Sequence, residues 1–193
     1  MRRINENKST KIEKYDKHKK AVATVRAGNV IGGGDWSDNR LIPDCIRFIE
    51  SGRDIEIRNP SSTRPWEHVL EPLSGYLKVG QKLQEDPVKF STSFNFGPSI
   101  ENNKTVMEVV QRLVSYYGKG RVVDASDPNA VHENTLLSLD VSKAYNMLNW
   151  KAKWSLTQAV EKTVDWYKAA LTTSDMYDFC QEQIGDHGEY LAR

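Results

Sequence analysis

Apolar residues recur along this chain at the spacings of alternating helices and strands. The clearest helical pattern covers 105–117, where one face is apolar: Val106, Val109, Val110, Leu113, Val114 and Tyr117. Another helix is predicted from the capping-box sequence S-L-T-Q at 155–158 to about Leu171. Further helices are predicted at 43–50, 72–84 and 141–148, with start signals at Pro43, Pro72 and Asp140.

Short apolar runs predict strands at 21–27, 55–58, 93–96 and 121–124. The alternation of strands with helices indicates an α/β fold with a parallel sheet. The run at 21–27 has the composition of a strand buried on both faces, and such a strand without neighbours leaves an open edge. We therefore expect marginal stability or association. Residues 21–171 are predicted to form the globular part, between a polar basic leader (1–20) and a loosely held polar tail (172–193).

Charge and cysteine content exclude several classes of protein. The net charge of +1 argues against a dedicated nucleic-acid binder, and the eight basic residues of 1–20 are interpreted as a solvated leader. Cys45 and Cys180 lie far apart, and neither a signal peptide nor an apolar run long enough to span a membrane is found. The four histidines and two cysteines lack the close spacing of metal ligands. These features predict a cytoplasmic protein without a metal site.

The first candidate site is the polar loop that follows the strand at 21–27. Asn29 is placed to donate its side-chain amide to an anionic oxygen, and Gly32, Gly33 and Gly34 would let backbone N–H groups approach the same ligand. A tight turn that requires positive φ explains these glycines equally well. The chain contains neither G-x-G-x-x-G nor G-x-x-x-x-G-K-[ST], so it carries no recognisable cofactor phosphate loop.

Other polar residues sit at places where they would face a crevice. Arg64 follows a Pro-Ser-Ser-Thr loop and precedes a helix, a position from which a guanidinium can clamp a diphosphate. Asn95 ends a predicted strand, as Asn29 does, and polar groups at strand ends converge on one edge of a parallel sheet. His132 and Glu133 would accept hydrogen bonds from sugar hydroxyls, or form an ordinary exposed loop pair. Trp66 and His68 flank Arg64 and are expected in the core.

Five sequence blocks occur in an order that resembles a known family. They are V-R-A-G-N-V-I-G-G-G-D-W (25–36), R-L-I-P-D (40–44), R-P-W-E-H-V-L-E-P-L-S-G-Y (64–76), F-N-F-G-P (94–98) and L-D-V-S-K-A (139–144). Together they resemble the C-terminal part of the CDP-glucose 4,6-dehydratase family, within the extended short-chain dehydrogenase/reductases. The resemblance extends from Tyr15 to about Leu171.

The resemblance implies an NAD-dependent dehydration of CDP-glucose to CDP-4-keto-6-deoxyglucose in deoxysugar biosynthesis. It also implies the last strands and helices of a Rossmann-like parallel sheet, with most of the dinucleotide-binding half and the family's catalytic residues absent from this chain. Asn29 and Arg64 match diphosphate contacts of the family, and Leu41, Ile42 and Pro43 match the segment that lines the base. Asn95, His132 and Glu133 match substrate-facing positions on shorter motifs.

Two classes of function remain open at this point. In one, the chain holds the substrate-binding half of a dehydratase and is inactive alone, while the Rossmann half is supplied by another polypeptide or not at all. In the other, it is a non-catalytic module that binds a nucleotide sugar or assembles with relatives, for example as a homodimer. Another NAD-dependent sugar-nucleotide epimerase or dehydratase is a further alternative.

Overall fold

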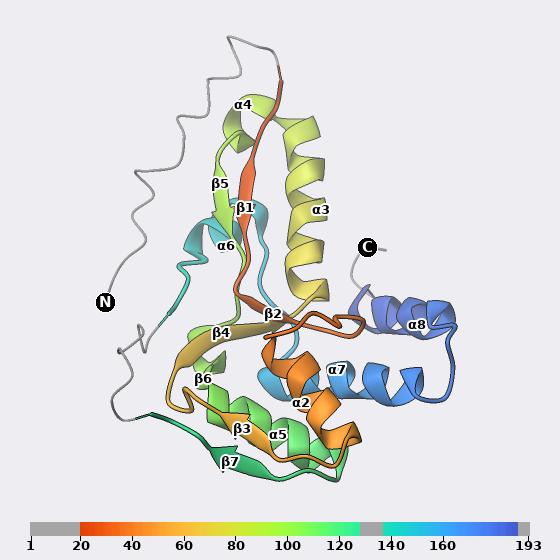
Figure 1. Cartoon of the computed structure of the whole chain (residues 1–193). Helices are drawn as coiled ribbons and strands as arrows, with labels where there is room; N and C mark the ends of the chain where they lie inside the picture. The colour runs from red at the N-terminus through yellow and green to blue at the C-terminus, as the bar shows by residue number, and fades with distance from the viewer. Residues whose placement is uncertain (1–19, 128–136, 189–193) are drawn as a thin grey trace.

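The computed structural model describes residues 20–127 and 137–188. All but Lys20 of the predicted basic leader lies outside these residues. Figure 1 shows two groups of elements: β1, β5, α3, α4 and α6 lie together at the top of the view, and α2, β3, α5, β7 and α7 lie below. Strands β2 and β4 cross between the two groups, so they connect them.

The strands pair in three small sheets. β1 (Thr24–Arg26) runs parallel to β5 (Ser93–Asn95), and β3 (Ile55–Ile57) runs parallel to β7 (Val122–Asp124). β4 (Thr63–His68) lies between β2 (Asn29–Ile31), to which it is parallel, and β6 (Asn103–Thr105), to which it is antiparallel. The predicted α/β class with parallel pairing is confirmed.

The five predicted helices form close to their expected positions, and two further helices form in the described part of the chain, at 87–90 and 177–188. They are α2 (Leu41–Glu50), α3 (Leu70–Glu85), the short α4 (Pro87–Phe90), α5 (Val106–Tyr117), α6 (Ser142–Leu148), α7 (Leu156–Ala170) and α8 (Tyr177–Gly188), with a 3-10 turn at Ile100–Asn102. The capping box of α7 is formed by Ser155 and Gln158 as predicted, and Thr105 and Glu108 form a second one on α5. The prediction of Asp140 as the N-cap of α6 is wrong, because Val141 is the N-cap residue. Asp140 lies one residue earlier and accepts a hydrogen bond from the Ser142 amide at 2.9 Å.

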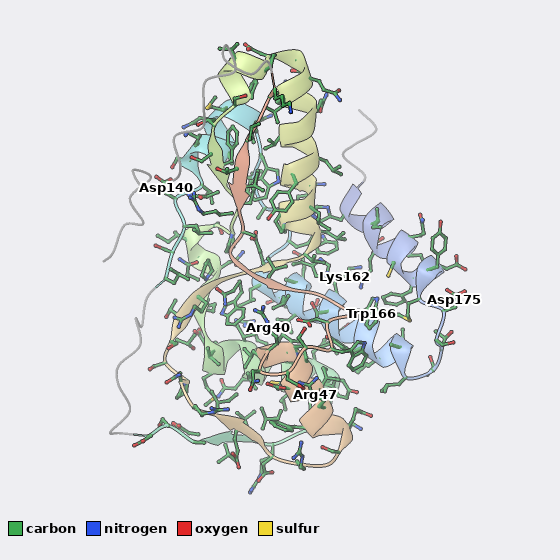
Figure 2. All side chains as sticks on the ribbon, turned by 45° about the horizontal axis from the view of Figure 1, so that its top comes forward. Arg40, Arg47, Asp140, Lys162, Trp166 and Asp175 are labelled. Carbon is green, nitrogen blue, oxygen red and sulfur yellow. The ribbon has the colours of Figure 1, made fainter. Side chains whose placement is uncertain are left out.

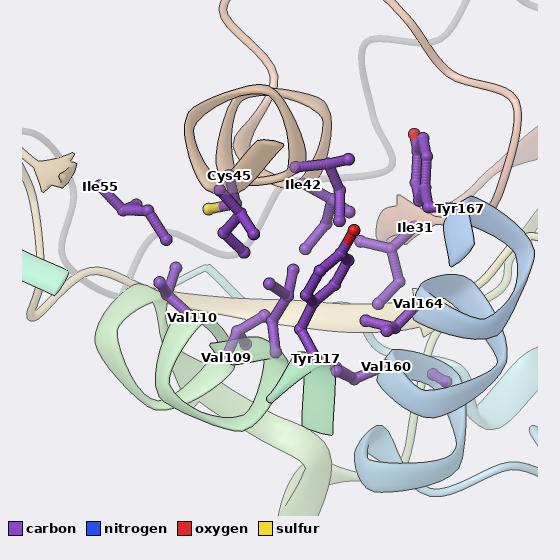
Figure 3. Close-up of a cluster of buried hydrophobic side chains, with 14 of the residues drawn as sticks. Ile31, Ile42, Cys45, Ile55, Val109, Val110, Tyr117, Val160, Val164 and Tyr167 are labelled. Carbon is purple, nitrogen blue, oxygen red and sulfur yellow. The ribbon is translucent and has the colours of Figure 1, made fainter. Parts of the chain in front are cut away.

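The larger core joins α2, α5 and α7 beneath β2 and β4. Figure 3 shows Ile42 and Cys45 of α2 facing Val109 and Val110 of α5. The apolar face predicted for α5 is buried here, since Val109, Val110 and Leu113 are completely enclosed. From α7, Val160, Val164 and Tyr167 complete the cluster. Burial of this periodic face explains why α5 matches its sequence pattern so well.

A smaller core fills the group that contains β1 and β5. Phe94 and Phe96 are enclosed there between α3 and α6, and the Phe96 ring meets Trp150 edge-on at 4.8 Å. A Cβ on Gly75 would lie 2.3 Å from the Phe96 ring, so glycine at this position lets α3 pack closely against the residue that follows β5. Among the described residues, β1 pairs with β5 alone, and Val25 of β1 is 37% exposed.

Three expectations need correction. Asn29 does not lie in a loop after a single strand, because the strand is interrupted at Ala27–Gly28 and a second strand, β2, begins at Asn29. Arg64 lies inside strand β4 and not between a loop and a helix. The chain beyond Thr172 is not a loose tail throughout, since α8 forms and buries Gln183 and His187. No described helix has both the length and the apolar character needed to cross a membrane.

Candidate functional site

A cavity of about 650 Å³ opens where β2 leads into the glycine loop and α2 begins. Its walls come from β2, the loop 32–39, the first turn of α2 and Trp66 of β4. Pairing of β2 with β4 sets Asn29 opposite Trp66, so both residues reach the same cavity. The structure thus brings together four predicted site residues: Asn29, Leu41, Ile42 and Pro43.

The N-terminal end of α2 forms one wall of the cavity. Arg40 occupies the N-cap position with extended backbone angles, and no side chain caps the helix there. Arg40 and the first-turn residues Leu41 and Ile42 line the cavity. The N–H groups of a helix start carry partial positive charge, and the Arg40 guanidinium adds a full one. This wall is therefore suited to an anionic group.

The glycines of the loop have different reasons to be glycine. Gly34 has a φ of +79°, which supports the tight-turn interpretation at that position. Gly32 and Gly33 line the cavity, and a Cβ on Gly33 would lie 2.0 Å from Cγ of Trp166 on α7. A Cβ on Gly32 would lie 2.7 Å from Val69. Gly32 and Gly33 are therefore required for close packing of the loop against Val69 and Trp166, in addition to any contact with a ligand in the cavity.

Asp35 and Arg40 supply the charged groups on the rim. Asp35 accepts a hydrogen bond from the Ser37 amide at 2.9 Å, which holds the pKa of this carboxyl below its usual range, and nearby Arg40 and Arg47 act in the same direction. Arg47 of α2 donates to the backbone oxygens of Trp36 and Ser37 at 3.0 and 3.2 Å. Figure 2 shows Arg40 and Arg47 on the same side of the molecule, near the start of α2 and along it.

Other predicted residues are not gathered at this cavity. Arg64 does not line it, and its Nη1 donates to the neighbouring Thr63 carbonyl at 3.0 Å. Asn95 donates to the Asp140 carbonyl at 3.1 Å, so the expected convergence of strand-end amides is not found. His132 and Glu133 lie outside the described residues. Trp66 and His68 are buried as expected, with the Trp66 indole donating to the Lys104 carbonyl.

A buried carboxylate next to the cavity was missed from the sequence. Glu67 is 2% exposed, and its Oε1 accepts a hydrogen bond at 2.9 Å from the amide of Gly28, a residue of the cavity wall. Its Oε2 has no hydrogen-bond partner among the described residues. Burial raises the pKa of Glu67 to about 7, more than the Gly28 hydrogen bond lowers it. A glutamate inside R-P-W-E-H-V offered no periodic signal for this burial.

The raised pKa of Glu67 predicts a pH-dependent stability. The folded state holds this proton more tightly than the unfolded chain, whose glutamate titrates near 4.5, so its stabilising effect is lost as pH rises from about 4.5 through about 7. Glu67→Gln removes the titration while its amide oxygen still accepts from Gly28. We expect the free energy of unfolding of the variant, relative to that of the wild type, to rise by about 2 kcal/mol between pH 5 and pH 8.

Chemical denaturation at pH 5 and pH 8 measures this gain. Glu56→Gln, on β3 with an exposed side chain, is the control and should show the same difference from wild type at both pH values. An equal stability difference for Glu67→Gln at the two pH values would contradict the assignment.

Within residues 20–127 and 137–188, no three His, Cys, Asp or Glu side chains come together as a metal site. Cys45 is buried in the core, and burial raises the pKa of its thiol to about 12, so it stays protonated.

Known proteins resemble this chain in sequence and in fold. It is 45% identical over 173 residues to CDP-glucose 4,6-dehydratase of Salmonella typhimurium, a match that covers 90% of this chain and 48% of that enzyme. The chain therefore spans about half the length of this curated relative. No protein-family model matches it.

Solved structures at lower identity share the fold. One is dTDP-glucose 4,6-dehydratase of Bacillus anthracis in complex with NAD, with a TM-score of 0.64, 21% identity, and coverage of 80% of this chain and 47% of that one. Another is UDP-glucuronic acid 4-epimerase of Bacillus cereus with UDP-glucuronic acid and NAD, with a TM-score of 0.66, 15% identity, and coverage of 80% and 48%. The chain is thus similar in sequence to CDP-glucose 4,6-dehydratase over about half of that enzyme's length, and it shares the fold of the matching part of these two NAD-bound enzymes.

Proposed function

We propose that this chain is the nucleotide-sugar-binding half of a CDP-glucose 4,6-dehydratase. The observation that carries the proposal is the cavity in which Asn29 meets Leu41, Ile42 and Pro43. The family resemblance independently matches Asn29 to a diphosphate contact and the other three residues to the segment that lines the base. The identity of 45% to the Salmonella enzyme supports CDP-glucose over other nucleotide sugars.

The chemistry of the cavity suits such a ligand. Its volume of about 650 Å³ lies in the range of small-molecule pockets. The diphosphate would lie against Arg40, the amides of Leu41 and Ile42 and the side-chain amide of Asn29, which supply one positive charge and several hydrogen-bond donors. Ile42 and Trp66 supply apolar surface for the base.

The glycine loop of this chain does not have the form of a dinucleotide-binding loop. A dinucleotide loop passes from a strand through glycines directly into a helix. Here the residues 35–40 separate Gly34 from the first residue of α2, Leu41. We infer that residues outside this chain would hold the cofactor in the complete enzyme. We place the complete activity in the cytoplasm, where nucleotide sugars and NAD are available.

Arg64, Asn95, His132 and Glu133 remain proposals as substrate contacts. Arg64 is half-buried in β4, two residues before Trp66 of the cavity wall. We propose that a rotation of its side chain brings the guanidinium to the diphosphate when ligand binds. Loss of affinity in Arg64→Ala tests this, and undiminished binding would end the clamp assignment.

Isothermal titration of the purified chain tests the proposed function. CDP-glucose is expected to bind with higher affinity than dTDP-glucose, and NAD is not expected to bind. Asn29→Asp keeps the shape of the side chain but places a negative charge beside the diphosphate, so we expect a loss of affinity of about ten-fold or more.

A matched substitution outside the cavity serves as the control. Asn146→Asp makes the same chemical change on an exposed position of α6, outside the cavity, and should leave the affinity unchanged. Folded wild type that binds no nucleotide sugar, or binds CDP-glucose and dTDP-glucose equally well, would contradict the proposal. Restored dehydration after addition of a complementary Rossmann half would favour a dehydratase over a purely binding or assembly module.

A further inference from the structure

The glycine loop of the cavity rests on two consecutive aromatic residues of α7. Trp166 packs against Gly33, in the position that a Cβ would otherwise occupy. The Trp166 ring meets the Tyr167 ring edge-on at 5.4 Å, and the Tyr167 ring meets that of Trp36 at 5.2 Å. Figure 2 shows Trp166 on the side of α7 where the chain that precedes α2 passes.

Tyr167 also makes a directional contact with this loop. Its hydroxyl donates a hydrogen bond of 2.5 Å to the carbonyl of Asp35, a residue of the cavity wall. The Tyr167 side chain is fully enclosed, and burial raises its pKa to about 12, with the Asp35 charge acting in the same direction. The hydroxyl therefore keeps its proton and remains a donor at physiological pH.

The next carbonyl of the loop is held by a different helix. Arg47 of α2 donates to the Trp36 carbonyl at 3.0 Å. Two successive carbonyls are thus fixed by different elements, α7 and α2. The path of residues 35–37 is set between them, because rotation of either peptide would break one of these hydrogen bonds.

We propose that Tyr167 is a positioning residue for the cavity, which it shapes by fixing the Asp35 carbonyl while Trp166 supports Gly33. It does not touch the nucleotide sugar; it acts through the loop. The proposal rests on the proposed function for the identity of the ligand, whereas the ordering of the loop is a property of the chain alone.

Tyr167→Phe is the direct test, because it removes the hydroxyl and keeps the ring in the core. Tyr117→Phe is a matched control from the same core: Tyr117 is 7% exposed, and its hydroxyl donates at 2.6 Å to Glu50, away from the cavity. Both variants lose one tyrosine hydrogen bond. Only Tyr167→Phe frees a carbonyl of the cavity wall.

Two readouts are needed for the full-length chain and both variants. Hydrogen exchange reports on the amides of 33–38, and titration with CDP-glucose reports on affinity. We expect Tyr167→Phe to accelerate exchange of these amides and to raise Kd by about five-fold, the size of effect of one buried hydrogen bond. Tyr117→Phe should change neither, even if both variants lower the melting temperature.

The outcomes separate this inference from the proposed function. Wild type that does not bind CDP-glucose defeats the proposed function, while loop exchange still decides whether Tyr167 orders the cavity wall. Unchanged exchange of 33–38 in Tyr167→Phe overturns the positioning role. An unchanged Kd in that variant, or equal effects of the two variants on the loop, overturns it as well.

Discussion

Replacing Glu71 with glutamine is expected to lower the free energy of unfolding by about 3 kcal/mol. Glu71 of α3 is completely enclosed, and its two carboxylate oxygens accept hydrogen bonds from the Trp154 and Lys153 amides at 2.8 and 3.0 Å. His187 of α8 lies 3.3 Å from the same carboxylate. A glutamine would turn an NH₂ group toward one of these amide donors, leaving two donors facing each other.

This effect is large because Glu71 connects parts of the chain that local interactions do not join. It links α3, the segment that precedes α7, and the end of α8, where Trp154 also packs edge-on against His68 and His187. Thermal unfolding should show a decrease of roughly 6–12 °C in Tm. Glu85→Gln on the same helix is the control, since the Glu85 side chain is about half exposed and should contribute little. A Glu71→Gln protein that melts with the wild type would show that this carboxylate is not a structural connection.

Gly33→Ala is expected to have the second large effect, on both stability and binding. The added methyl group would lie 2.0 Å from Cγ of Trp166, so the loop or the indole must move. Overpacking of this kind costs about 1–3 kcal/mol. Because Gly33 lines the cavity, a displaced loop should also weaken binding of CDP-glucose.

Gly80→Ala makes the same chemical change and is expected to raise stability, whereas Gly33→Ala is expected to lower it. Gly80 lies inside α3 with no atom within 4 Å of an added Cβ, so alanine should raise stability by about 0.5–1 kcal/mol. Denaturant unfolding compares both variants with wild type. Equal stability changes for the two would mean that the contact between Gly33 and Trp166 does not constrain the loop.

Predictions from the sequence succeeded where neighbouring residues determine the structure. The helix of 105–117 and the capping box at Ser155 are predictable because periodicity and caps depend on residues within one or two turns. Strands β3, β5 and β7 are recognisable as short apolar runs bounded by polar residues.

Polar segments concealed the elements that were missed. Strand β4 reads T-R-P-W-E-H, which lacks a clear apolar alternation because its buried Glu67 and His68 depend on distant partners. Helix α8 turns Gln183 and His187 inward, and Gln183 donates to the Lys162 carbonyl of α7 at 2.7 Å. A helix whose buried positions are polar gives no amphipathic signal.

The α/β class, the family resemblance and the ends of several helices were predictable, because they depend on composition and short-range spacing. The fold was needed to show that Asn29 and Leu41–Pro43 share a cavity, that Arg64 lies in a strand outside it, and that Tyr167 donates a hydrogen bond to the Asp35 carbonyl. Those outcomes depend on pairing of β2 with β4 and on packing of α7 beneath a loop more than a hundred residues earlier. Contacts between such distant segments leave no periodic pattern in the chain, so their geometry appears only when the segments meet.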